Sequence, residues 1–219
     1  MPRSYAIGDI HGSLDKLRKL IGKCRQHAEG QPMTLVFLGD YIDRGPQSRG
    51  VIRTLIELQA ELRDRVITLK GNHEAIAVEI IDGTTEADFW LTQGGAETLA
   101  SYGVDRARDL PREHVHWLRS LPLSYDDGRR FFVHAGINPQ RSFDRQDESD
   151  LIWIREPFLS DDRDYGRLIV HGHTPVAGSK PELRHNRLNL DTAAVYGGPL
   201  TAAVFDDAQT NPIAFLQVD

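Results

Sequence analysis

The sequence predicts an α/β fold on the strength of two observations. Short apolar runs alternate along the chain with segments whose apolar residues recur at helical spacing, an order typical of α/β domains. Several of these runs end at a glycine that is followed by Asp, Asn or His, and open α/β sheets bind ligands at the carboxyl ends of their strands. We therefore expect a single catalytic domain over residues 1–219.

The composition is that of an ordinary globular protein, with 40% hydrophobic and 26% charged residues. The formal net charge of −6 argues against sequence-independent binding to nucleic acid, which needs a basic face. No stretch approaches the ~18 apolar residues of a membrane span, and the amino terminus turns polar too soon for a signal peptide. We expect a cytoplasmic protein with neither nucleic-acid nor membrane partners, and the sequence leaves its oligomeric state open.

The first half of the chain is predicted to alternate strictly between strand and helix. The first helix follows Ser13, a typical cap residue, and carries its apolar side chains along one face. Trp90 and Leu91 are expected in the core of a later helical region. Strands are expected at 5–7, 35–38 and 66–69, and helices from 14 to about 27, at 48–62 and from 75 to about 103.

The second half is predicted to be richer in strands. Asp127-Gly128 separates two apolar runs in the pattern of a β-hairpin, and a helix is expected between Pro111 and Leu118. Residues 141–165 are polar and irregular apart from the apolar run 151–154, and such long connections are often lids or binding loops. Strands are expected at 121–125, 129–133, 167–170, 187–191, 200–205 and 213–217.

Five of the predicted strand ends carry side chains that can bind a metal ion. Taken singly each is weak evidence, because Asp40 could cap the next helix and Asn72 could be an ordinary turn residue. Asp9 and His11 lie two positions apart, so an extended backbone would point both to one side. Five such motifs in one chain are not expected by chance. The candidate ligands are Asp9, His11, Asp40, Asn72, His134 and His173.

Three oxygen donors and three imidazoles can hold two metal ions if one carboxylate bridges them. This mixture of ligands suits Mn, Fe or Zn better than Mg or Ca, and two adjacent ions imply a bridging hydroxide that attacks phosphorus in line. Arg44 adds a planar fork of donors for phosphate oxygens. His73 can protonate a leaving alkoxide, with Asp43 as the acid that orients it. Glu74 is expected to begin a helix or to support a ligand.

Five sequence motifs of the chain resemble those of a known enzyme superfamily. Gly8-Asp9-Ile10-His11-Gly12, Gly39-Asp40-Tyr41-Ile42-Asp43-Arg44-Gly45, Gly71-Asn72-His73-Glu74, His134-Ala135-Gly136 and Gly172-His173-Thr174 resemble those of the calcineurin-like metallophosphoesterases. Within that superfamily the chain looks most like the short bacterial and phage members of the PPP-type serine/threonine protein phosphatases.

The resemblance implies a four-layer α/β/β/α sandwich of two central mixed sheets, with a dinuclear and usually Mn-activated centre. It would place Asp9, His11 and Asp40 on one ion, and Asp40, Asn72, His134 and His173 on the other, with Asp40 as the bridge. It also implies a His73–Asp43 pair and phosphate binding by Arg44.

The resemblance also implies a second phosphate-binding arginine between the last two histidine motifs. Arg155 is the candidate, Arg163 competes for the role, and either could instead form a surface ion pair. Many metallophosphoesterases have a histidine at the position of Pro175, and the protein-phosphatase branch lacks it as well. His171 is expected to be structural, or else to support a ligand.

These observations together predict a metal-dependent phosphomonoesterase that acts on phosphoserine and phosphothreonine in proteins, with His73 as general acid. The first alternative is a symmetric dinucleoside tetraphosphate hydrolase, which has similar motifs but tends to be longer. A second alternative is a catalytically silent scaffold that keeps the fold for protein binding. The retention of every ligand and of the acid argues against the scaffold.

Overall fold

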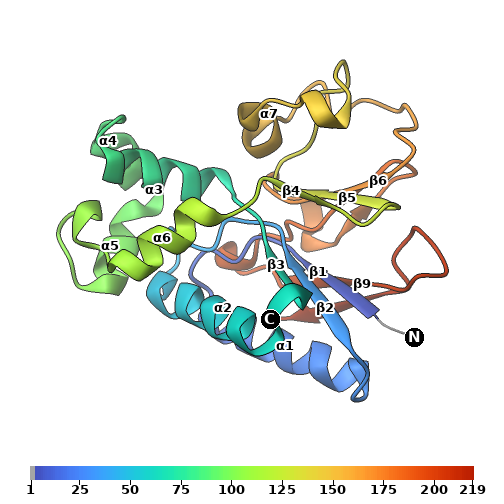
Figure 1. Ribbon diagram of the computed structural model, residues 1–219, viewed down its shortest axis with the longest axis horizontal. Helices are drawn as coiled ribbons and strands as arrows, with labels where there is room; N and C mark the ends of the chain where they lie inside the picture. The colour runs from blue at the N-terminus through green and yellow to red at the C-terminus, as the bar shows by residue number, and fades with distance from the viewer. Residues whose placement is uncertain (1–2) are drawn as a thin grey trace.

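The computed structural model describes residues 3–219 and consists of two five-stranded sheets that lie between helices (Figure 1). The prediction of an α/β fold with two mixed sheets flanked by helices is confirmed. Among the described residues, none of the helices is both long and apolar enough to cross a membrane.

The first sheet has the strand order β10-β9-β1-β2-β3. Strands β1, β2 and β3 are parallel to one another, and β3 forms one edge of the sheet. Strand β9 runs antiparallel to both of its neighbours, β1 and β10. Two long helices connect the parallel strands, as parallel pairing requires. The bounds are β1 (Arg3–Ile7), α1 (Leu14–Ala28), β2 (Met33–Phe37), α2 (Ser48–Leu62), β3 (Val66–Thr68), β9 (Leu200–Phe205) and β10 (Ala214–Val218).

The second sheet has the order β4-β5-β6-β8-β7, with β5, β6 and β8 parallel and the two edge strands antiparallel to their neighbours. The predicted hairpin is present, but its first strand begins only at Ser124. Pro122, which has no N–H to give to a sheet, lies in the connection before it. The bounds are β4 (Ser124–Asp126), β5 (Arg130–Val133), β6 (Leu168–His171), β7 (Glu182–Leu183) and β8 (Arg187–Asn189).

The remaining helices gather at one end of the first sheet, except for α7, which covers the second (Figure 1). Within 141–165 the apolar run ends a short helix, so this connection is less irregular than the sequence indicates. A π-helical turn at Leu91–Gly95 joins α4 to α5. The bounds are α3 (Asn72–Asp82), α4 (Ala87–Trp90), α5 (Ala96–Tyr102), α6 (Arg112–Ser120) and α7 (Glu148–Trp153).

Strand alternation explains why the first sheet reads as continuous apolar runs. In β2, Leu35 and Phe37 pack toward the helices, whereas Val36 and the following Leu38 pack against the second sheet. A strand buried on both faces needs an apolar residue at every position. Phe132 and Val170 contribute from the second sheet to the same inter-sheet core.

Candidate metal centre

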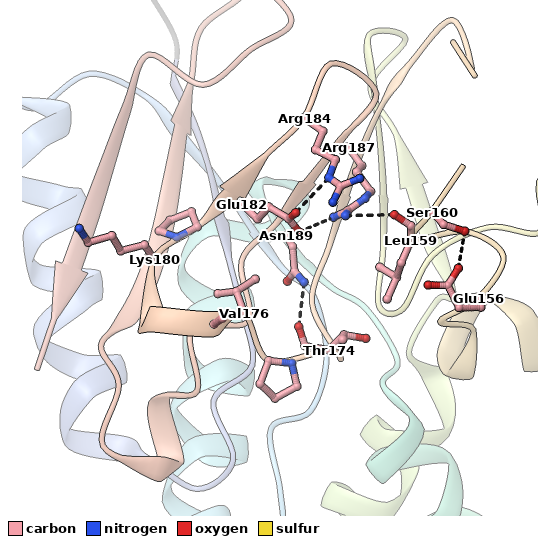
Figure 2. Close-up of a pocket in the computed structure, with 13 residues that line it drawn as sticks. Glu156, Leu159, Ser160, Thr174, Val176, Lys180, Glu182, Arg184, Arg187 and Asn189 are labelled. Carbon is pink, nitrogen blue, oxygen red and sulfur yellow. Dashed lines mark hydrogen bonds and ion pairs between the residues drawn. The ribbon is translucent and has the colours of Figure 1, made fainter. Parts of the chain in front are cut away.

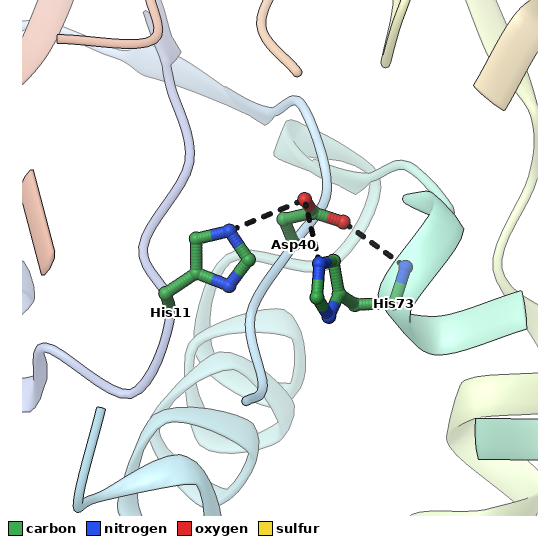
Figure 3. A group of neighbouring side chains, drawn as sticks. All are labelled: His11, Asp40 and His73. Atoms are coloured by element: carbon green, nitrogen blue, oxygen red, sulfur yellow. Dashed lines mark hydrogen bonds and ion pairs between the residues drawn. The ribbon is translucent and has the colours of Figure 1, made fainter. Parts of the chain in front are cut away.

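The six predicted ligands are all buried; five lie in the loops that follow β1, β2, β5 and β6, and Asn72 is the first residue of α3, which comes after β3. Four of them, together with His73, form two groups whose ligand atoms lie within 4.8 Å of one another. The first group is His11, Asp40 and His73 (Figure 3), and the second is Asp40, His134 and His173. Asp40 belongs to both groups, as a bridging ligand would.

Asp9 stands beside these groups rather than within them. Its carboxylate accepts the backbone N–H of His173 at 3.1 Å. The expectation that an extended strand aligns Asp9 with His11 is wrong, because β1 ends at Ile7 and His11 has a φ of +43°. The loop conformation, not strand alternation, brings these side chains to the centre.

Glycine is required where the backbone passes the two carboxylates. A Cβ atom on Gly172 would lie 2.0 Å from Oδ1 of Asp9, and one on Gly71 would lie 2.2 Å from Oδ1 of Asp40. Such approaches are too short for any side chain, so the strand-end glycines seen in the sequence let the loops close around the ligands.

Backbone carbonyls set the orientation of two imidazoles. Nδ1 of His11 donates to the carbonyl of Ile42 at 2.8 Å, and Nδ1 of His134 donates to that of Leu38 at 3.0 Å. In a neutral ring the other nitrogen, Nε2, then keeps a free lone pair. The second contact also joins the two sheets at the centre.

These lone pairs face the carboxylate of Asp40, an arrangement that suits a cation between them, and that of His11 also accepts from Nη1 of Arg44 at 2.7 Å. Nε2 of His11 lies 3.3 Å from Oδ2 of Asp40, and Nε2 of His134 lies 3.4 Å from Oδ1 of the same carboxylate. Burial would raise the pKa of Asp40, but attraction to the imidazoles of His134, His73 and His11 in their protonated forms lowers it well below its usual range. Within residues 3–219, Nε2 of His173 has no hydrogen-bond partner.

The donor set therefore fits divalent metal ions, with imidazole nitrogen and carboxylate oxygen in the mixture that suits Mn, Fe or Zn. Burial, followed by the charges of Asp191 and Asp40, raises the pKa of Asp9 well above its usual value. A cation at the centre would relieve this repulsion between carboxylates. The assignment of each ligand to one of two ions stays a prediction.

His73 and Asp43 form the buried pair that the sequence predicts. Nδ1 of His73 lies 2.7 Å from Oδ2 of Asp43 and donates to it, because a carboxylate can only accept. Nε2 of His73 is left facing the centre, 3.9 Å from Oδ2 of Asp40. The ring is therefore placed to give a proton at the metal centre.

A model of the calcineurin-like phosphoesterase family matches residues 2–201 of the sequence. The chain belongs to that family. An asymmetrical bis(5'-nucleosyl)-tetraphosphatase PrpE from Anoxybacillus flavithermus is 30% identical, over 93% of this chain and 91% of the relative. A serine/threonine-protein phosphatase 1 from Salmonella typhimurium is 29% identical, over 91% of this chain and 90% of the relative.

The fold of this phosphoesterase is also found in a solved protein serine/threonine phosphatase from Saccharomyces cerevisiae. The two structures superpose with a TM-score of 0.69 at 16% identity, over 99% of this chain and 80% of the other. A likeness at this identity concerns the fold, and it agrees with the two-sheet architecture described above.

Arg44 lies at the edge of the centre of this phosphoesterase, where the sequence predicts a phosphate-binding group. Its Nη1 is 2.7 Å from Nε2 of His11, and its guanidinium lies 5.8 Å from the ring centroid of Tyr196. Beside it opens a cavity of about 330 Å³ lined by Arg44, Leu91, Thr92, Gln93, Gly94, Glu97 and Tyr196. The cavity has room for a group attached to a bound phosphate.

The two competing arginines have different surroundings. Arg163 donates to Asp161 at 2.9 Å and to the carbonyl of Pro139, so it holds its own loop together. Arg155 is exposed, and its charge is one of the influences, after burial and His134, that lower the pKa of His173 to about 3. Because Arg163 is engaged within its own loop, Arg155 remains the candidate for phosphate binding, and its role stays a prediction.

A separate cavity of about 690 Å³ lies between residues 156–160 and 174–189 (Figure 2). There Arg187 donates to Glu182 at 2.9 Å and to the carbonyl of Leu159 at 3.2 Å. The cavity is lined by none of the predicted ligands, so we assign it no part in the chemistry. Arg187 also lies near His171, with Nη1 3.5 Å from its Nε2. Nδ1 of His171 donates to the carbonyl of Gly172, so its observed contacts are structural.

Sequence reasoning missed three buried polar residues at this site. Trp90 was expected only to fill the core, but its Nε1 donates to Oδ2 of Asp43 at 2.8 Å. Thr98 donates to Oδ1 of Asp43 at 2.7 Å. Asp191, two residues after β8, is buried, and its charge helps to raise the pKa of Asp9. The sequence predicts a strand through residue 191, which hid Asp191; the available signal was an acid near the carboxyl end of an apolar run, as for Asp9 and Asp40.

Glu74 supports the loop that carries Asp40. Its carboxylate accepts the backbone N–H groups of Asp40, Tyr41 and Ile42 at 2.8, 2.8 and 3.3 Å, and that of Gly71 at 2.9 Å. Burial, with the charge of Asp40, raises the pKa of Glu74 to about 8. Glu74 also lies in the first turn of α3 and accepts from the N–H of the cap residue Gly71, so both roles that the sequence left open are observed.

We expect Glu74→Ala to lower the free energy of unfolding by about 3–5 kcal/mol, because four buried donors lose their acceptor at about 1–3 kcal/mol each before water or relaxation compensates. Urea denaturation of both proteins measures the change. Glu79→Ala, an exposed position in the same helix, is the control and is expected to change stability by less than about 0.5 kcal/mol. Equal losses in the two variants would contradict the anchoring role.

Proposed function

We propose that this phosphoesterase removes phosphate from phosphoserine and phosphothreonine side chains of proteins. The observation that carries the proposal is the buried His73–Asp43 pair, with the free nitrogen of His73 facing the metal centre. A serine or threonine alkoxide is a poor leaving group and needs a proton as it departs, whereas a nucleotide phosphate leaves more easily without one. A well-oriented buried acid is therefore most useful for an alkyl ester.

In this proposal the metal ligands, Arg44 and the His73–Asp43 pair each have a separate role in hydrolysis. Divalent ions held by the six ligands would polarise the phosphate and lower the pKa of a water. Arg44 binds equatorial phosphate oxygens through its planar fork. His73 gives the proton on Nε2 to the serine oxygen as the P–O bond breaks, and Asp43 stabilises the protonated ring in this orientation.

A second candidate substrate is a dinucleoside tetraphosphate. It is favoured by the PrpE relative, an asymmetrical tetraphosphatase, because the chain covers 91% of that protein. The expectation of a longer chain concerns the symmetric hydrolases and does not apply to the asymmetrical type. The exposed ring of Tyr196 beside Arg44 could also stack on a nucleobase, since base–aromatic stacking contributes about 1–3 kcal/mol.

Turnover of a phosphoserine peptide and of diadenosine tetraphosphate, measured side by side with Mn supplied, tests the proposal. We expect the higher kcat/KM for the peptide. A higher kcat/KM for the dinucleotide would replace the first candidate with the second. Hydrolysis of neither substrate with Mn, Fe or Zn would instead favour the scaffold.

A further inference from the structure

The segment that carries Asp43 and Arg44 has a backbone conformation that most residues avoid. Asp43 has a φ of +71° and Arg44 a φ of +66°. Non-glycine residues keep such conformations only where the surroundings impose them, and they gather at functional sites for that reason. The contacts that hold these two residues therefore identify what positions the chemistry.

Those contacts come largely from the α4–α5 segment, residues 87–102. The N–H of Asp43 donates to Oγ1 of Thr98 at 2.8 Å and to Oγ of Ser48 at 3.2 Å. The N–H of Arg44 donates to the carbonyl of Gly94 at 3.1 Å. A Cβ on Gly94 would lie 2.3 Å from that nitrogen, so the π-helical turn can approach only because residue 94 is glycine.

The same segment also holds the carboxylate of Asp43. Oδ2 accepts from both His73 and Trp90, and Oδ1 accepts from Thr98. All four side chains are buried, with exposed fractions of 1% or less. The carboxylate cannot rotate without breaking at least one buried hydrogen bond to a charged group, which is costly where no water replaces it.

We propose that Trp90 and Thr98 are positioning residues for proton donation by His73. They fix the carboxylate of Asp43, and Asp43 in turn holds Nε2 of His73 toward the leaving oxygen. This inference rests on the proposed function, because it assumes that a leaving group is protonated. Neither residue touches the substrate; each acts through Asp43.

The test uses Trp90→Phe and Thr98→Val, which keep most of the packing and remove one donor each. We expect kcat for a phosphoserine peptide to fall about ten- to a hundredfold, the loss expected for one hydrogen bond to a charged group, with KM little changed. For p-nitrophenyl phosphate, whose phenolate leaves readily, the fall is expected to be several times smaller. The ratio of the two losses is the readout that a purely structural role would not move.

Two further measurements make the result decisive. Trp117→Phe is the matched control, because Trp117 is also buried but its Nε1 donates to Gln59, outside the site. It is expected to leave both activities unchanged. In a His73→Asn background, Trp90→Phe is expected to cause no further loss of kcat, because the group through which it acts is already absent.

Equal losses for the alkyl and aryl esters, or an additive loss in the His73→Asn background, would overturn the inference and leave the proposed function standing. A wild-type protein that hydrolyses neither ester would overturn both. Circular dichroism and thermal unfolding of each variant show whether a loss of activity reflects a loss of fold.

Discussion

Replacing His73 with Asn is expected to lower kcat for a phosphoserine peptide by about a hundred- to ten-thousandfold, the usual contribution of general acid catalysis. The Asn amide can still donate to Asp43, which His73 contacts at 2.7 Å, but it offers no second nitrogen to protonate the serine oxygen. KM is expected to change little, because Arg44 and the metal centre remain. Steady-state kinetics on the purified variant measure both constants.

Metal content distinguishes the acid from a ligand. His73 lies in the first group with His11 and Asp40, so geometry alone also permits it to bind an ion. If it is the acid, the variant retains the metal content of the wild type; loss of an ion would show that His73 is a ligand. His116→Asn, at an exposed position, is the control and is expected to behave as the wild type.

Asp40→Asn is expected to abolish measurable activity and to weaken metal binding by more than about a hundredfold. Loss of a residue that merely orients a ligand already costs about 10–100-fold, and Asp40 is the one residue shared by the two groups among the described residues 3–219. Asn keeps the shape of the side chain but removes the negative charge on which His11 and His134 converge.

Elemental analysis after dialysis, together with phosphatase assays, measures both effects. Asp15→Asn, an exposed acid of α1, controls for the change in net charge. Two ions per chain in the Asp40 variant, at the affinity of the wild type, would contradict the bridging role.

The sequence predicted most helices and strands correctly, because the spacing of apolar residues that distinguishes them repeats many times along the chain. The helix predicted at 48–62 is α2 with the same bounds, and each buried strand of the first sheet appears as an apolar run. The short edge strand β7 was not predicted. β7 has only two residues, one of them exposed, so it carries neither an apolar run nor an alternation to detect.

The sequence by itself determined which chemical groups this phosphoesterase presents at its strand ends. Each of these groups comes shortly after a strand and directly after a glycine or an apolar residue, as seen for Asp40, Asn72 and His134. That signal is local and does not depend on the rest of the chain. The pairing of His73 with Asp43 was likewise predicted, because the roles of an acid and its orienting carboxylate restrict the choice to few residues.

Only the tertiary structure decided how the segment around residues 40–46 is held. The hydrogen bond from Thr98 to Asp43 joins positions 55 apart, and that from Trp90 joins positions 47 apart. Neither leaves a local pattern, since Trp90 reads as a core residue from its apolar ring. The positive φ of Asp43 and Arg44 is equally invisible, because it follows from contacts with another segment and not from the residues themselves.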